Sequence, residues 1–195
     1  MQRDETSSRN PKDTMNALFD QFVQRRIKNC EFTVSPVDTA KELELWLTKL
    51  DQFYAVIART LRPWTERGSV QLILEEFTLD EFPVGPYQAR RGRIIIGDEM
   101  LRLDPIGTFL IGSRGRVDMR NGFSTSRFVI VPPGASTSRF NPHVDPANPD
   151  AGVIFDDPPI EEWVWKLMTP SPRIHYIDLT PMLFREQLMG LIDDE

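Results

Sequence analysis

The spacing of apolar side chains changes along the chain, from a helical period near the N-terminus to an alternating period in the middle. Residues 13–28 place apolar side chains every three or four positions, which predicts a first helix with one apolar face. Residues 1–12 hold almost nothing apolar, so we expect a flexible tail there. The remaining residues, 13–195, suit a single domain.

A second helix is the clearest prediction of the pattern. Ser35 and Pro36 are typical of the residue before a helix and of its first position. An apolar stripe about five turns long follows, at helical spacing. Its members are Leu43, Trp46, Leu47, Leu50, Phe53, Tyr54, Ile57 and Leu61. Because the residue before a proline disfavours the helical conformation, Pro63 predicts that this helix ends near Arg62.

From Ser69 onward the period approaches two, which is typical of strands with one better-buried face. The predicted strands are Val70–Glu75, Arg93–Ile96, Met100–Leu103, Thr108–Ile111, Val117–Arg120, Ser124–Val131, Trp163–Met168 and Arg173–Leu179. Asn121 and Gly122 form a strong two-residue hairpin signal, since both tolerate a positive φ. Thr180 and Pro181 predict the start of a short last helix.

These elements predict an α+β fold, because no alternating strand–helix–strand units occur. We expect two N-terminal helices packed on a mostly antiparallel sheet of about six or seven strands. The short C-terminal helix would close an edge or the other face of that sheet. A curled sheet fits the same pattern. Residues 132–152, rich in Pro, Asn, Gly and Ser, predict a long irregular loop of the kind that is often functional.

The net charge of −6 is distributed unevenly. Residues 87–140 carry nine basic groups, all of them arginine, against four acidic ones. Guanidinium groups form planar forks of donors that suit carboxylates and phosphates. If several share one sheet face, they form a basic surface. The candidate binding residues are Arg91, Arg93, Arg114, Arg116, Arg120 and Arg127.

Cys30 is the single cysteine, which excludes a disulfide within the chain and a zinc site built on cysteines. No apolar run approaches the roughly 20 residues of a membrane-spanning helix. The polar N-terminus lacks the apolar stretch of a secretory signal. We therefore expect a cytoplasmic protein with no membrane partner, and the sequence predicts no cofactor.

His143, Asp145 and His175 provide the only candidate metal-ligand set of two histidines and a carboxylate. The spacing H-x-D followed later by H is that of the facial triad of non-haem iron enzymes. Here the H-x-D lies in a proline-rich loop, and His175 shares a strand face with Ile177 and Leu179. That position favours a packed core histidine over a metal ligand.

Three hypotheses of function remain open. The leading one is a non-enzymatic protein–protein interaction module of a cytoplasmic, bacterial-type system, such as an immunity, adaptor or chaperone-like protein. Its arginines and the 132–152 loop would contact an acidic partner protein, and internal ion pairs of Arg114, Arg116 and Arg120 would remove that contact. The second is a phosphate- or nucleic-acid-binding protein that uses the same arginines. The third is a metal-dependent enzyme that uses His143, Asp145 and His175.

Overall fold

The computed structural model divides the chain into two compact units, Met1–Val37 and Asp38–Glu195. It describes Asp20 and residues 39–82, 84–108, 113–137, 143–144, 153–154 and 159–193. The predicted tail and the predicted first helix therefore lie outside the described residues. The account below concerns the second unit.

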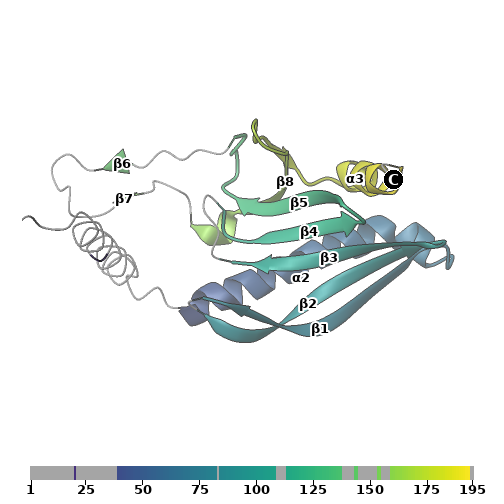
Figure 1. The fold of residues 1–195 in the computed structure, drawn as a ribbon, viewed down its shortest axis with the longest axis horizontal. Helices are drawn as coiled ribbons and strands as arrows, with labels where there is room; N and C mark the ends of the chain where they lie inside the picture. The colour runs from purple at the N-terminus through teal and green to yellow at the C-terminus, as the bar shows by residue number, and fades with distance from the viewer. Residues whose placement is uncertain are drawn as a thin grey trace, which may run out of the picture. The chain divides into compact units, whose positions relative to one another are not determined.

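Seven strands form one antiparallel sheet in which neighbours in the sheet are also neighbours in sequence (Figure 1). They are β1 (Gln71–Glu81), β2 (Gly85–Ile96), β3 (Glu99–Gly107), β4 (Arg116–Asn121), β5 (Ser124–Val131), β8 (Val164–Met168) and β9 (Tyr176–Asp178). The order is β1-β2-β3-β4-β5-β8-β9. A separate two-stranded pair joins β6 (His143–Val144) to β7 (Val153–Ile154). The predicted antiparallel α+β fold is confirmed.

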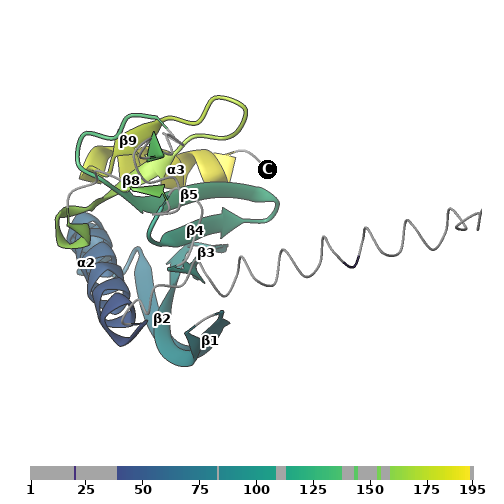
Figure 2. The ribbon, with the colours of Figure 1, turned by 90° about the vertical axis from the view of Figure 1, so that its left-hand side faces the viewer.

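Helix α2 (Thr39–Thr65) lies along one face of the sheet, as Figure 2 shows from the side. The predicted stripe is its core-facing side, where Trp46, Leu50, Phe53 and Ile57 are each no more than 2% exposed. The helix continues past the predicted end at Arg62. Pro63 lies inside the last turn, and Trp64 beyond it packs against the core. Burial of Trp64 offsets the cost of the proline, so tertiary packing sets this helix end.

Helix α3 (Pro181–Asp193) covers the same face of the sheet as α2. The ring of Phe128 on β5 lies 5.4 Å from Phe53 of α2 and 6.0 Å from Phe184 of α3, measured between centroids. The prediction that this helix closes an edge or the other face is therefore wrong. Its predicted start is confirmed, because the Thr180 hydroxyl accepts a hydrogen bond from the Leu183 N–H at 3.1 Å. A one-turn 3-10 helix, η1 (Ile160–Glu162), precedes β8.

Two strand connections differ from the sequence prediction. In the β4–β5 hairpin, Asn121 still pairs with Ser124, so the turn consists of Gly122 and Phe123. Asn121 stays in the strand because its side-chain amide donates to the Leu191 carbonyl of α3 and to Glu99. Strand β3 ends at Gly107, which has a φ of +141°. The N–H of Thr108 donates to the Glu81 carboxylate instead of a strand partner, and the rest of the strand predicted over 108–111 lies outside the described residues.

Candidate functional site

The sheet face turned away from the helices carries six arginines from four adjacent strands. On each of these strands the arginines alternate with core residues, as Arg102 does between Leu101 and Leu103. We call this surface the arginine face, and its arginines are Arg91, Arg93, Arg102, Arg116, Arg120 and Arg127. Five of the six arginines predicted as binding residues therefore share one surface.

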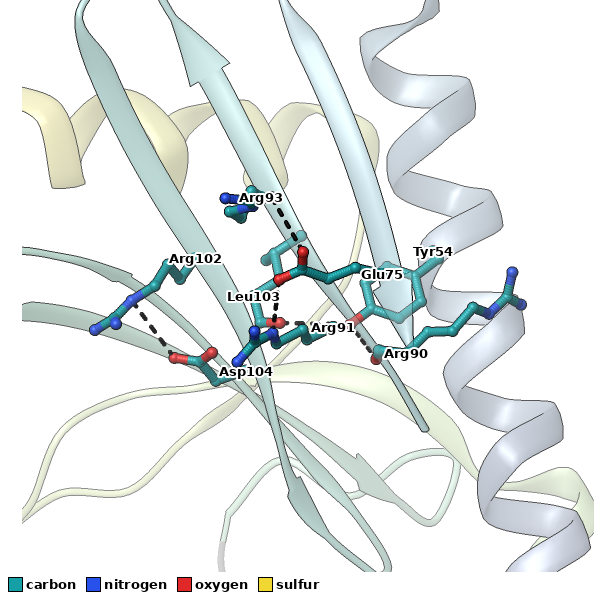
Figure 3. A network of polar contacts seen from close by, with 8 residues as sticks. All are labelled: Tyr54, Glu75, Arg90, Arg91, Arg93, Arg102, Leu103 and Asp104. Carbon is teal, nitrogen blue, oxygen red and sulfur yellow. Dashed lines mark hydrogen bonds and ion pairs between the residues drawn. The ribbon is translucent and has the colours of Figure 1, made fainter. Parts of the chain in front are cut away.

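Arg114 is the exception among the predicted binding residues. Its guanidinium lies 3.4 Å from the Glu42 carboxylate of α2, on the helix side of the sheet. Gly115, with a φ of +156°, separates it from the alternation of β4. Arg90 also points away from the arginine face, toward Asp51 of α2 (Figure 3). Alternation along β2 places Arg90 on the face opposite to Arg91, but no count along the sequence reveals that Arg114 faces the helix side.

Three of the arginines stand directly opposite one another on neighbouring strands. The register pairs Arg93 of β2 with Arg102 of β3, and Arg102 with Arg120 of β4. Adjacent strands are about 4.8 Å apart, and like charges directly opposite in a sheet are destabilising. This row therefore needs carboxylates close by.

Three carboxylates on the same face supply that compensation, and Figure 3 shows Glu75 and Asp104 among them. Glu75 lies 2.8 Å from Arg91 and 3.0 Å from Arg93. Asp104 lies 3.9 Å from Arg102, which is a loose pair. The third is Asp118. In the described part of the chain, six guanidinium groups on this face thus meet three carboxylates, and positive charge remains in excess.

Asp118 is the most buried of these carboxylates, with a side chain 1% exposed. Arg116 donates to both of its oxygens, at 2.7 and 3.0 Å. Arg120 donates to it at 2.7 Å, and this hydrogen bond raises the pKa of Arg120. The buried carboxylate of Asp118 therefore holds the guanidinium groups of Arg116 and Arg120 in fixed positions. The pattern R-x-D-x-R over residues 116–120 carries this information in the sequence, because alternate residues of a strand share a face.

The ion pairs change the leading hypothesis of function. Arg114, Arg116 and Arg120 all pair with carboxylates of this chain. The predicted contact, in which these three unpaired guanidinium groups meet an acidic protein, is therefore wrong. What the arginine face offers instead is an excess of donors held in fixed positions.

Several donors on this face have no acceptor among the described residues. The Nε atoms of Arg93, Arg120 and Arg127 are buried and lack a hydrogen-bond partner in the described structure. Buried donors without a partner are uncommon in folded proteins. They point to an acceptor that is not part of this chain's described residues.

Two of the three predicted metal ligands, His143 and His175, lie within the described residues. His143 lies in β6, where its backbone pairs with Ile154, and His175 forms an isolated bridge with Thr137. Asp145 lies outside the described residues, as does most of the predicted 132–152 loop. Among the residues that the structure describes, no three His, Cys, Asp or Glu side chains gather closely enough to hold a metal ion.

Comparison with known proteins assigns this chain to no family. No family model matches it, and neither a curated protein nor a solved structure gives a match. Within its described part, no helix is long and apolar enough to cross a membrane. The argument about function therefore depends on the geometry of the arginine face.

Proposed function

We propose that this chain is a non-enzymatic binding protein that takes a phosphate group of its partner on the arginine face. The observation that carries the proposal is the row Arg93–Arg102–Arg120, on a face where six arginines meet three carboxylates of the described residues. The partner protein expected from the sequence is compatible with this proposal if that protein carries the phosphate group.

The donors left over by the internal ion pairs favour phosphate as the ligand. A guanidinium group has five N–H donors, and Arg120 uses one of them on Asp118. A carboxylate from a partner offers two acceptor oxygens and a single negative charge. A phosphate dianion has three strong acceptor oxygens and can bridge several guanidinium groups without displacing Asp118.

Arg102, Arg120 and Arg127 are the best candidates for the centre of this site. Arg102 has the longest ion pair of the face, at 3.9 Å. Arg127 stands directly opposite Asp118 on β5, next to Arg120. All three can therefore turn donors toward a bound anion, while Asp104 and Asp118 hold Arg102 and Arg120 in place.

Nucleic acid is a weaker candidate for the same surface. Single-stranded nucleic acid is held by exposed aromatic side chains on which bases stack. Within the described residues, the two strongly exposed aromatics are Phe82 and Phe123, and both lie in hairpin turns. Phe77, beyond Glu75 on β1, is half-buried below the Arg91 guanidinium at 5.5 Å. The net charge of −6 also opposes a long polyanion.

The test is calorimetric titration of the protein with pyrophosphate at low and moderate salt. We expect binding at low salt that weakens as salt is added, because the arginines are partly exposed. Arg102→Gln and Arg120→Gln should each weaken binding about tenfold, the effect of one charge-assisted hydrogen bond. Arg59→Gln, an exposed position on α2, is the matched control.

Two results would contradict the proposal. One is the absence of any pyrophosphate binding at low salt. The other is a double variant, Arg102→Gln with Arg120→Gln, that binds as well as Arg59→Gln. A titration with citrate distinguishes a carboxylate ligand from a phosphate ligand. Tighter binding of citrate than of pyrophosphate would indicate that the arginine face binds carboxylates of a partner.

A further inference from the structure

The row of three arginines is bordered on one side by apolar side chains of the same sheet face. Ile95 lies two residues after Arg93 on β2 and so faces the same way. Met100 lies two residues before Arg102 on β3, and the register pairs it directly with Ile95. Ile73 of β1 pairs with Arg93. One step along the strands from the positive row, the arginine face therefore becomes apolar.

The turn between β4 and β5 extends this apolar region. Continuing the β3–β4 register brings Met100 level with Gly122 in that turn. The Asn121 amide donates to the Glu99 carboxylate at 3.1 Å, so the start of β3 and the end of β4 lie side by side. Phe123 completes the turn, and its side chain is fully exposed. We call these side chains the apolar border; they are Ile73, Ile95, Met100 and Phe123.

Met100 and Phe123 are the most exposed members of the apolar border. Met100 is 47% exposed, and the side chain of its neighbour Arg102 is 58% exposed. Single exposed apolar side chains are ordinary on a protein surface, but several that adjoin beside polar groups are typical of a binding surface. Residues two apart on a strand are about 7 Å apart. Arg102 and Met100 therefore offer a contact for an anion and a contact for an apolar group at that spacing.

We infer that the arginine face and its apolar border together bind a phosphorylated segment of a partner protein, with an apolar side chain two residues from the phosphorylated one. This inference rests on the proposed function and names the source of the phosphate. In an extended peptide, side chains two residues apart lie on the same side, about 7 Å apart. The phosphate then contacts Arg102 and the arginines beside it, while the apolar side chain covers Met100.

A phosphorylated peptide fits this surface better than the other sources of phosphate. Inorganic phosphate would leave the apolar border in contact with water. A lipid bilayer with anionic lipids presents a wide field of negative charge, which the net charge of −6 opposes. A peptide brings one phosphate dianion to the locally positive arginines, and clusters of arginines are a recurring means of binding phosphorylated peptides.

Three synthetic peptides test the inference by calorimetric titration of the full chain. The first has leucine two positions before and two positions after a phosphoserine, so it can bind in either direction. The second has serine in place of both leucines, and the third is the leucine peptide without its phosphate. The leucine phosphopeptide should bind about tenfold more tightly than the serine phosphopeptide, because Met100 and Phe123 remove part of a leucine from water. The peptide without phosphate should show no binding at the same concentrations.

Variants of the apolar border show whether it causes this preference. Met100→Ser and Phe123→Ser should each bring the ratio of the two phosphopeptide affinities toward one. Two exposed residues outside the border provide matched controls: Met182 of α3 is 65% exposed, and Phe82 in the β1–β2 turn is 87% exposed. Met182→Ser and Phe82→Ser should keep the tenfold ratio.

Equal affinities of the two phosphopeptides for the unaltered protein would overturn the inference, whether or not any variant folds. If pyrophosphate binds in that case, the proposed phosphate site remains and only its phosphopeptide ligand is wrong. If pyrophosphate does not bind either, the proposed function fails as well. Sedimentation with vesicles of phosphatidylcholine and phosphatidic acid, abolished by Met100→Ser, would also overturn the inference, because the apolar border would then contact lipid.

Discussion

Arg120 donates a 2.7 Å hydrogen bond to Asp118, a carboxylate that is almost completely shielded from solvent by the fold. The same carboxylate accepts a two-pronged contact from Arg116. An isolated buried carboxylate is strongly unfavourable, so Asp118 and its two arginines must be understood as one unit. We make four predictions, one from this unit and three from the contacts of Lys49, Glu81 and Gly115.

Replacing the Asp118 carboxylate should destabilise the fold. Asp118→Asn removes the negative charge and leaves Arg116 and Arg120 facing each other and Arg102. We expect the free energy of unfolding to fall by about 2 kcal/mol, below the full cost of breaking a buried pair because the arginines are partly exposed. Denaturant titration measures this. Asp80→Asn, at an exposed position of β1, should change stability by less than about 0.5 kcal/mol.

Lys49 should matter for stability despite its charge. Its ammonium donates to the carbonyls of Glu161 and Trp163, both at 2.7 Å, and so ties α2 to the segment before β8. Burial lowers the pKa of Lys49, while Glu161 opposes that shift. Lys49→Met keeps an unbranched apolar stem of nearly the same length but loses both hydrogen bonds, so we expect a loss of about 2 kcal/mol.

Lys41→Met provides the control for Lys49. Its ammonium lies 3.6 Å from Glu161 and its side chain is 64% exposed, so the loss should stay below about 0.5 kcal/mol. Equal losses in the two lysine variants, measured by chemical denaturation, would contradict a special role for Lys49.

Glu81 should make stability depend on pH in the mildly acidic range. Burial raises the pKa of Glu81, and its hydrogen bonds with Thr108 and Tyr87 oppose this only in part. The folded state therefore binds the proton more tightly than the unfolded state just above the ordinary value of 4.5. In that window the Glu81 contribution to stability rises as the pH falls.

Glu81→Gln removes this pH dependence. The stability of the unaltered protein relative to the variant should therefore increase as the pH is lowered from 7 toward about 4.5. Parallel denaturant titrations across that range measure the difference. A difference that stays constant, or that shrinks on acidification, would mean that burial does not raise the pKa of Glu81.

Gly115 should resist any side chain. A Cβ atom would lie 2.5 Å from the Trp46 ring, and the φ of +156° is strained for other residues. We expect Gly115→Ala to cost about 3 kcal/mol, from overpacking added to backbone strain. Gly134 also has a positive φ, +76°, but no atom lies within 4 Å of a Cβ placed there. Gly134→Ala therefore measures the cost of a positive φ without a steric collision. Equal thermal midpoints for the two variants would show that the contact with Trp46 is not limiting.

The sequence determined the parts of this protein that depend on local periodicity. The stripe from Trp46 to Leu61 predicts the buried side of α2, since residues three and four apart share a helix face. Alternation predicts β4 and β5 on either side of Gly122, and Thr180 with Pro181 predicts the start of α3. Alternation also predicts that Arg91 and Arg93 share a face of their strand, as Arg116 and Arg120 do of theirs.

Only the tertiary structure decided the relationships between elements that are distant in sequence. The cross-strand register sets Arg93, Arg102 and Arg120 opposite one another and brings Glu75 to Arg91, sixteen residues away. The apolar patterns of α2 and α3 do not reveal that Phe53 and Phe184 both pack against the ring of Phe128. Periodicity states which way a side chain faces within its own element, whereas pairing and packing depend on the free energy of the whole fold.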